Sequence, residues 1–250
     1  MAGDWLLDLG HSRLKLARRS GEGLPTGHQA MPAEAFPRWL DDQAPPAGDR
    51  FWLAATPAAE QWRPLAEALE RRGCRWRQVV TGAVPLPVAA AYPELGVDRW
   101  LSMQPVWLKY GGPFCLVGFG TASTVDLVDG QGVHRGGWIA PGLGPARDAL
   151  FGRAPGLRRA GSVADLDPGP ACDTARAVAR GLWMQQLGLV RMALDEAGKR
   201  PGFDGIRLVL TGGDASALQS ANIAWPVEVI VAPDLVLEGL ALAVDRLLHS

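Results

Sequence analysis

Four residues near the start of the chain have types and spacing that suit phosphate chemistry: Asp8, Gly10, Ser12 and Lys15. A glycine turn offers backbone N–H groups, and a hydroxyl and an ammonium add further donors. A carboxylate beside such a turn repels a phosphate unless a cation lies between them. Asp8 therefore indicates Mg²⁺, held through one carboxylate and mostly water. The plainer alternatives are an aspartate that caps its own turn and a lysine that faces solvent.

A second stretch of the same character occupies residues 114–129. An apolar run leads into Gly118-Phe119-Gly120, and Thr121 begins a run of four small residues before a second apolar run. An ordinary hairpin turn is the alternative, because glycine marks tight turns everywhere. Aligning Asp8 with Gly118 matches strand, glycine turn, hydroxyl residues and second strand at an offset of 110 residues. The two stretches are therefore interpreted as an internal repeat.

Three further motifs carry polar or glycine residues at the ends of expected elements. A carboxylate and a guanidinium, Asp98 and Arg99, start an expected helix and offer a general base and an anion clamp. The alternative is that Asp98 is an N-cap. Gly212 and Gly213 follow an expected strand and would let a flat ligand such as adenine approach the backbone, or simply form a turn. Glycines within 136–142 could admit a ligand or another backbone.

Hydrophobic patterning supplies the elements that must position these residues. Strands are expected at 5–9, 14–17, 51–55, 75–80, 114–117, 125–129, 133–140, 206–210 and 227–231, and helices at 33–42, 57–72, 97–109, 141–150, 172–199 and 233–248. Residues 21–46 otherwise form a polar segment rich in glycine and proline, and 153–170 a polar loop.

The order of these elements predicts an α/β protein of two similar domains, residues 1–110 and 111–250. A loop from each domain would line one cleft, so that a nucleotide has its phosphates clamped from both sides. The sequence leaves open whether the closing helix at 233–248 packs on the second domain or returns to the first.

Composition excludes several classes of function. The 250 residues carry a formal net charge of −1, which gives no field for nucleic acid or an anionic membrane. Three scattered cysteines without a CxxC pair argue against a thiolate zinc site, and reduced thiols fit the cytoplasm. Acids at the N-terminus argue against a signal peptide, and four acids interrupt the apolar region at 225–248, which cannot span a membrane.

Five motifs in order resemble the type III pantothenate kinases, including the Bvg accessory factor branch. They are DLGHSRLK at 8–15, GVDR at 96–99, GTASTVD at 120–126, GGWIAPG at 136–142 and TGG at 211–213. The resemblance implies two duplicated ribonuclease H-like (actin-like ATPase) domains of the sugar kinase, actin and chaperone ATPase superfamily. It also implies a homodimer that transfers the ATP γ-phosphoryl group to pantothenate, opening coenzyme A synthesis.

The resemblance also implies a role for each matching residue. Asp98 corresponds to the base that accepts the proton of the pantothenate hydroxyl, and Arg99 suits the substrate carboxylate. Thr174 matches a threonine that reaches pantothenate across the dimer interface. The remaining substrate contacts are Tyr92, Gly96 and Val97. The implied ATP-binding residues are Asp8 (with Mg²⁺), Leu9, Gly10, His11, Ser12, Arg13, Leu14, Lys15, Thr121, Gly212 and Gly213.

Two of the loops depart from the family pattern. The first loop usually carries asparagine and threonine where this chain has His11 and Ser12; serine keeps the hydroxyl, but the imidazole changes the donor geometry. The second loop usually begins with an aspartate that holds a monovalent cation, and here that position is Gly118. Without the carboxylate we expect weak or absent dependence on K⁺ or NH₄⁺.

Two other functions compete with the kinase. A weakly active or non-catalytic homologue could act as an accessory or regulatory protein, which His11 and Gly118 favour and Asp98, Arg99 and Lys15 oppose. A kinase of the same superfamily could also act on another small hydroxy acid. A DNA-binding regulator is disfavoured, because neither a basic face nor a recognised DNA-binding motif is visible.

Overall fold

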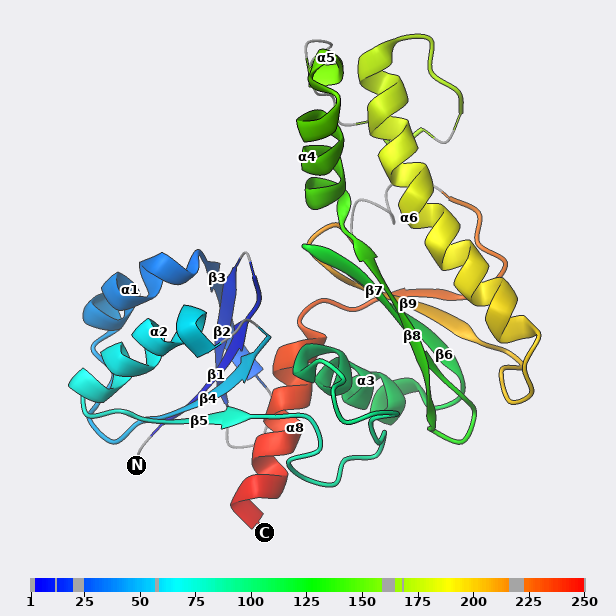
Figure 1. The fold of residues 1–250 in the computed structure, drawn as a ribbon. Coiled ribbons are helices and arrows are strands. Elements are labelled where there is room, and N and C mark those ends of the chain that lie inside the picture. Colours follow the sequence, from blue (N-terminus) through cyan, green and yellow to red (C-terminus); the bar gives the residue numbers. More distant parts are fainter. Residues whose placement is uncertain are drawn as a thin grey trace. The chain divides into compact units, whose positions relative to one another are not determined.

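A computed structural model describes residues 3–11, 13–19, 25–56, 59–158, 165–167, 169–215 and 223–249. The chain forms two compact units (Figure 1). Unit 1 comprises Met1–Gly111 with Asp234–Ser250, and unit 2 comprises Gly112–Pro233. The closing helix, whose packing the sequence left open, thus belongs to unit 1. Each unit contains one mixed five-stranded sheet with helices, which confirms the predicted α/β fold class.

The sheet of unit 1 has the strand order β3-β2-β1-β4-β5. Its strands are β1 (Asp4–Leu9), β2 (Leu14–Arg19), β3 (Pro25–Met31), β4 (Arg50–Ala55) and β5 (Arg75–Val79). Strand β1 pairs antiparallel with β2 and parallel with β4, and β4 pairs parallel with β5 through the crossover helix α2 (Ala59–Arg71). This arrangement puts the β1–β2 turn beside the end of β4.

The sheet of unit 2 repeats this topology, with the order β10-β9-β6-β7-β8. Its strands are β6 (Phe114–Phe119), β7 (Ala122–Val128), β8 (His134–Pro141), β9 (Arg207–Gly212) and β10 (Val229–Val231). Strand β6 pairs antiparallel with β7 and parallel with β9, as β1 does with β2 and β4. Strands β1 and β6 start and end 110 residues apart, so the repeat inferred from the sequence is confirmed.

The helices follow the predicted positions closely. Unit 1 has η1 (Ala33–Ala35), α1 (Phe36–Gln43), α2, α3 (Val97–Tyr110) and α8 (Leu235–His249), and unit 2 has α4 (Leu143–Arg153), α5 (Pro155–Arg158) and α6 (Thr174–Gly198). No helix in the described part of the chain is long and apolar enough to cross a bilayer.

Two expectations were wrong in detail. Strand β3 forms inside the segment expected to be polar, glycine-rich and mostly irregular, because β2 offers it an antiparallel partner although most of its side chains are exposed. A bulge near Gly27, whose φ is 64°, interrupts that pairing. The short helix α5 lies in the segment expected to be a loop.

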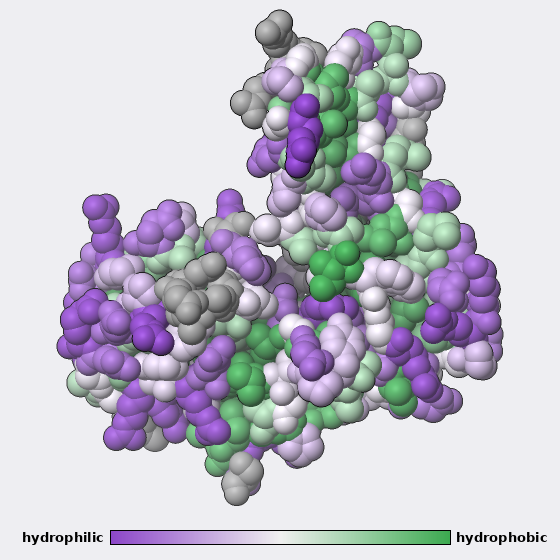
Figure 2. All heavy atoms as spheres, viewed as in Figure 1, coloured by the Kyte–Doolittle hydropathy of each residue, from purple (hydrophilic) through white to green (hydrophobic). Residues whose placement is uncertain are grey.

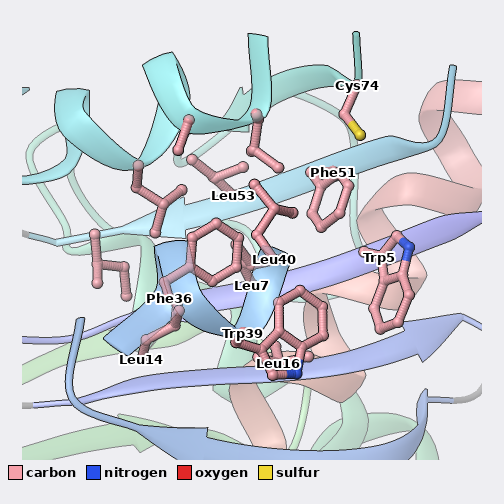
Figure 3. Packing of buried hydrophobic residues seen from close by; sticks show 14 of the residues in the cluster. Trp5, Leu7, Leu14, Leu16, Phe36, Trp39, Leu40, Phe51, Leu53 and Cys74 are labelled. Carbon is pink, nitrogen blue, oxygen red and sulfur yellow. The ribbon is translucent and has the colours of Figure 1, made fainter. Parts of the chain in front are cut away.

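The core of unit 1 fills the space between the sheet and helices α1 and α2 (Figure 3). Trp5 stacks on Phe51 with ring centroids 5.8 Å apart and meets Trp39 edge-on at 5.1 Å. Aromatic pairs of this geometry add about 0.5–1.5 kcal/mol beyond the area they bury. The alternating apolar residues of β1 thus fix one face of the strand that carries Asp8.

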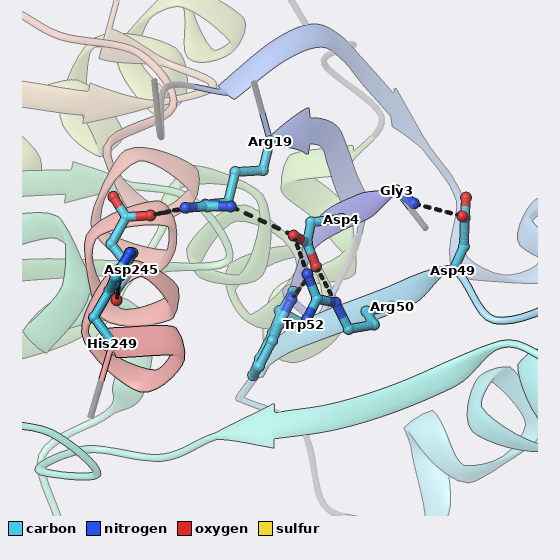
Figure 4. A network of polar contacts seen from close by, with 8 residues as sticks. All are labelled: Gly3, Asp4, Arg19, Asp49, Arg50, Trp52, Asp245 and His249. Atoms are coloured by element: carbon cyan, nitrogen blue, oxygen red, sulfur yellow. Dashed lines mark hydrogen bonds and ion pairs between the residues drawn. The ribbon is translucent and has the colours of Figure 1, made fainter. Parts of the chain in front are cut away.

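A buried polar network holds the other end of β1 (Figure 4). The Asp4 carboxylate accepts two hydrogen bonds of 2.7 Å from Arg50 and one of 3.0 Å from Trp52 Nε1. Arg19 lies 3.4 Å from the same carboxylate and also pairs with Asp245 of α8. Bidentate charged pairs of this kind are strong and directional. The network therefore ties β1, β2, β4 and α8 together.

In unit 2, the core lies between the sheet and α6. Cys115, Val117 and Phe119 of β6 pack with Leu187 and Val190 of the helix. Burial raises the pKa of the Cys115 thiol to about 12, so it is a core residue rather than a nucleophile.

Candidate active site

The β1–β2 hairpin brings an aspartate and a lysine together. Asp8 and Lys15 are directly opposite in the antiparallel register, so their side chains share one face of the sheet. Gly10 closes the turn by donating its N–H to the carbonyl of Arg13 at 3.1 Å. Ser12, a predicted phosphate donor, lies outside the described residues. His11 and Arg13 are exposed at the turn.

Two hydrophobic residues anchor this turn rather than line a ligand site. Leu9 and Leu14 pair with each other across the hairpin and belong to the core of unit 1. Their predicted contribution to ATP binding is therefore restricted to backbone groups, because their side chains are buried.

The Asp8 carboxyl is strongly perturbed. Burial, reinforced by the negative charges of Asp98 and Asp234, raises its pKa to about 7 despite the opposing charge of Lys15. Among the described residues, no hydrogen bond or ion pair joins this carboxylate to another side chain. A divalent cation would relieve this concentration of negative charge, so the residues fit the expected Mg²⁺.

Asp98 lies in the first turn of α3, where the backbone N–H groups of a helix stabilise negative charge. The N-cap position is occupied by Gly96, so the interpretation of Asp98 as an N-cap is wrong. A Cβ atom added at Gly96 would lie 2.6 Å from Asp98 Oδ1, so only glycine leaves room for the carboxylate in this position. The side chain of Val97 is buried.

Arg99 and Tyr92 are joined by a hydrogen bond. Arg99 is 6% exposed, and its Nη1 donates to the Tyr92 hydroxyl oxygen at 3.0 Å. Tyr92 itself is 37% exposed. The contact fixes the direction of a buried guanidinium beside Asp98, which suits an anion clamp.

A further carboxylate of the site, which no sequence motif contains, is Asp234, the residue directly before α8. Its Oδ1 accepts from Lys15 Nζ at 2.9 Å, and its Oδ2 lies 3.0 Å from His28 Nδ1. Burial opposes ionisation, but the hydrogen bonds and charges of Lys15 and His28 outweigh it and lower the pKa of Asp234. The sequence signal was too weak to find it, because an aspartate before a helix is typical of an ordinary cap.

The β6–β7 hairpin of unit 2 is the second copy of the β1–β2 hairpin. Gly118 pairs with Thr124, as Asp8 pairs with Lys15. A Cβ atom at Gly118 would lie 2.8 Å from Thr124 Oγ1. Thr121 accepts a hydrogen bond at its carbonyl from Gly142 N at 2.9 Å. The space a carboxylate stem would need at residue 118 is therefore partly occupied by a hydroxyl.

Several motif glycines of unit 2 serve close approach of backbone to backbone. A Cβ atom would lie 1.7 Å from the carbonyl oxygen of Val125 at Gly137 and 2.0 Å from that of Gly120 at Gly142. Gly212 has φ 95°, and its Cβ atom would lie 2.1 Å from the Phe119 carbonyl oxygen. Of the two possibilities for residues 136–142, close packing of another backbone explains Gly137 and Gly142.

Two other residues of the unit 2 motifs occupy different surroundings. An added Cβ atom at Gly213 would meet no atom within 4 Å, so this glycine is open to a ligand. Asp126 is buried, 2.8 Å from His134 Nε2, which links β7 to β8.

Thr174 lies at the start of α6, where Asp173 accepts the N–H of Arg176 as an N-cap. It lines a groove of about 610 Å³ formed by α4, α5 and α6, whose apolar lining includes Leu150, Leu157, Val178 and Leu182. Figure 2 shows hydrophobic residues gathered along this groove.

The structure brings Asp8, Lys15, Asp98 and Asp234 together in unit 1, and places Thr121 and Thr174 in unit 2.

Two five-stranded sheets of the same topology, one in each unit, define a duplicated α/β fold. Two solved structures share the fold. One, described as a Baf family transcriptional activator from Campylobacter jejuni, has TM-score 0.65 and 16% identity, covering 98% of this chain and 100% of that one. The other, described as a 2-dehydro-3-deoxygalactonokinase protein from Sinorhizobium meliloti, has TM-score 0.58 and 17% identity over 98% of each chain.

The chain belongs to the type III pantothenate kinase family, whose model matches residues 6–196. The type III pantothenate kinase of Alkalilimnicola ehrlichii is 36% identical over 95% of this chain and 96% of its own length. That of Ectopseudomonas mendocina is 41% identical over 61% of this chain and 60% of its own length. The match to the first two relatives spans about 60% of their length.

Proposed function

We propose that the chain transfers the γ-phosphoryl group of ATP to the hydroxyl of pantothenate, giving 4′-phosphopantothenate, the first step of coenzyme A synthesis. The observation that supports this proposal most strongly is that Asp98 lies near Asp8 and Lys15 in a member of this family. Phosphoryl transfer needs mainly a metal, phosphate donors and a placed base, and this grouping supplies the residues for all three.

Asp8 and Lys15 act on the phosphates. Asp8 would hold Mg²⁺ through its carboxylate, with water completing the coordination. When bound, the ion supplies neutralisation of charge on the phosphate oxygens. Lys15, whose side chain is 33% exposed, can reach an anion from the same face of the sheet. The turn at Gly10 adds backbone donors.

Asp98 acts on the substrate hydroxyl. Its carboxylate accepts the hydroxyl proton while the hydroxyl oxygen forms a bond to the γ-phosphorus. The bond from that phosphorus to the bridging oxygen breaks, and ADP leaves with the electron pair. The proton moves late in a loose transition state, so the base needs placement more than a raised pKa.

Arg99 would bind the pantothenate carboxylate, since a buried guanidinium with a fixed direction favours a planar anion. Tyr92 fixes that direction through its 3.0 Å contact and leaves part of its ring exposed to substrate. Gly96 and Val97 contribute by shaping the start of α3. The pair of Arg99 and Tyr92 favours a small carboxylic acid as substrate.

Unit 2 would contribute backbone donors to ATP at Thr121, Gly212 and Gly213.

We also propose a homodimer, in which Thr174 of a second copy contacts pantothenate. The groove beside Thr174 supports this, because many of the side chains that line it are apolar and exposed apolar side chains favour contact with a partner. The reaction uses soluble metabolites and is proposed to take place in the cytoplasm, which suits free cysteines such as Cys172.

We propose that this kinase works without a monovalent cation. Gly118 provides no carboxylate, and a Cβ atom there would lie only 2.8 Å from Thr124 Oγ1. Activity in buffers free of potassium and ammonium should therefore be within about twofold of that with either ion added, since no charged ligand is lost or gained. Strong activation by either ion would contradict this.

A coupled ADP-release assay tests the proposed function. The protein is incubated with Mg²⁺ and ATP, with and without pantothenate, and in parallel with other small hydroxy acids. We expect ADP release that depends on pantothenate. Release with another acid alone would assign a different substrate to the same chemistry, and silence with all of them would favour an accessory protein.

A further inference from the structure

The ammonium of Lys15 is bound by a distant carboxylate, although another lies directly opposite. Asp8 faces Lys15 in the strand register, yet among the described residues Lys15 Nζ donates to Asp234 Oδ1 at 2.9 Å and not to Asp8. Asp234 is 219 residues away in sequence. The chain therefore returns its closing segment to the first hairpin and supplies the carboxylate that Lys15 contacts.

Asp234 is held firmly in this position. Its φ of 62° lies in the left-handed region, which few residues other than glycine and asparagine adopt readily. Its carbonyl accepts the N–H of Glu238 at 3.2 Å in the first turn of α8, and His28 contacts its second carboxylate oxygen. A residue kept in a strained conformation by surrounding contacts is typical of functional sites.

Two carboxylates thus compete for one ammonium. At 4 Å, an ion pair near a protein surface has a Coulomb energy of about 4 kcal/mol. Asp8 lies directly opposite Lys15 and close to the negative charges of Asp98 and Asp234, so its carboxylate would gain strongly from pairing with the ammonium. Such a pair would neutralise Asp8 and keep both groups from Mg²⁺ and the phosphates.

We propose that Asp234 is a positioning residue that holds Lys15 away from Asp8, leaving the Asp8 carboxylate to Mg²⁺ and the ammonium to the phosphates. This inference rests on the ATP site of the proposed function. Asp234 lies beyond residues 6–196, which the family model matches. Its role therefore derives from the contacts of this structure.

The test is the Mg²⁺ dependence of ATP binding, measured by titration calorimetry on the full chain. Asp234→Asn removes the charge but keeps a side chain that tolerates the left-handed backbone. We expect it to raise the Mg²⁺ concentration needed for half-maximal ATP binding by about tenfold, as loss of a carboxylate to a competing ion pair implies. Glu238→Gln is the matched control, because it removes a 2.7 Å pair with Lys109 from the same helix. It should leave the Mg²⁺ requirement unchanged.

A double-mutant cycle separates positioning from a structural effect. With Lys15→Met, no ammonium remains to pair with Asp8, so adding Asp234→Asn should not raise the Mg²⁺ requirement further. An equal rise in both backgrounds would overturn the inference, as would an unchanged requirement in Asp234→Asn alone. Steady-state kinetics add a second readout: KM for ATP should rise in Asp234→Asn while KM for pantothenate stays the same.

The two ideas fail in different ways. If the unmutated protein binds ATP with Mg²⁺ but does not phosphorylate pantothenate, the substrate assignment fails and the role of Asp234 can still be measured. If pantothenate is phosphorylated and Asp234→Asn needs no more Mg²⁺ than the unmutated protein, the inference fails and the function stands. Absence of ATP binding in the unmutated protein would overturn both.

Discussion

Asp98 is the residue on which the proposed chemistry depends most. It lies at the start of α3 with space made by Gly96, and beside Arg99. Spacing in the sequence identified this pair because the two residues are adjacent. The surroundings of the two residues could be described only from the fold. The sequence alone could not exclude that Asp98 is an N-cap, and the structure shows that this alternative is wrong.

Replacing Asp98 by asparagine should abolish the base and keep the shape of the site. We expect the Asp98→Asn variant to bind ATP normally and to lose at least about a hundredfold in kcat, the usual effect of removing an acid–base group. Steady-state kinetics with calorimetric ATP binding would measure both. Turnover near the unmutated rate would remove Asp98 from this role.

Asp8 should make the metal-free protein less stable as the pH rises. Its folded-state pKa is raised from 3.8 to about 7, so its protonated form favours folding at low pH and this contribution is lost as the pH rises through 7. The Asp8→Asn variant cannot ionise. In a metal chelator, it should exceed the unmutated protein in free energy of unfolding by on the order of 2 kcal/mol at pH 8, with a smaller difference at pH 5.

Urea unfolding at the two pH values would measure this difference. Arg135→Gln, an exposed partner of the structural Asp129, is a control for general charge effects. If the difference in unfolding free energy between the Asp8→Asn variant and the unmutated protein is the same at pH 5 and pH 8, the pKa of Asp8 is not raised in the folded protein.

Among the secondary-structure elements, the packing of α3 on α8 positions the residues of the candidate site. Pro105 carries no N–H, so the carbonyl of Leu101 has no partner four residues later in the helix. Gly239 of α8 packs against this carbonyl, and an added Cβ atom would lie 2.0 Å from its oxygen. The same two helices carry Asp98 and the residues after Asp234, so their separation matters for the site.

A methyl group at Gly239 should separate these helices. We expect Gly239→Ala to lower the unfolding free energy by about 2 kcal/mol, within the range for overpacked cores. Gly188 of α6 is the matched control, because an added Cβ atom there meets no atom within 4 Å. Gly188→Ala should stabilise the protein by about 0.5–1 kcal/mol through helix propensity. Thermal unfolding would measure both, and equal effects would contradict the close contact.

Elements were predictable where patterning was strong and local. Strands β1 and β6 have apolar runs ending in glycine turns, and α6 has a long pattern with few breakers. Strand β3 was missed because its side chains are mostly exposed and its stability comes from pairing with β2. Propensity within a segment does not report a partner elsewhere in the chain.

At the level of the whole molecule, the repeat was visible in sequence because both hairpins keep their spacing over 110 residues. The pairing of Lys15 with Asp234 was not, since 219 residues separate them and Asp234 belongs to none of the sequence motifs. Local motifs thus gave the chemistry of the candidate site, and long-range contacts decided which charges meet within unit 1.

The proposed homodimer can also be tested at the level of the whole molecule. A charge in the apolar groove of unit 2 should prevent association, so we expect Val178→Glu to be a monomer at concentrations where the unmutated protein is a dimer. Sedimentation velocity would measure this, with Val133→Glu, an exposed site between β7 and β8, as control. An unmutated protein that is monomeric, or a Val178→Glu variant that still dimerises, would contradict the proposed interface.

The most direct test of the central claim is the mass spectrum of pantothenate after incubation with the protein, Mg²⁺ and ATP. We predict a product heavier by one phosphoryl group, with fragmentation placing the phosphate on the terminal hydroxyl. The product should form at least about a hundredfold more slowly with Asp98→Asn. Unchanged pantothenate, recovered after incubation with folded protein that binds ATP, would contradict the account.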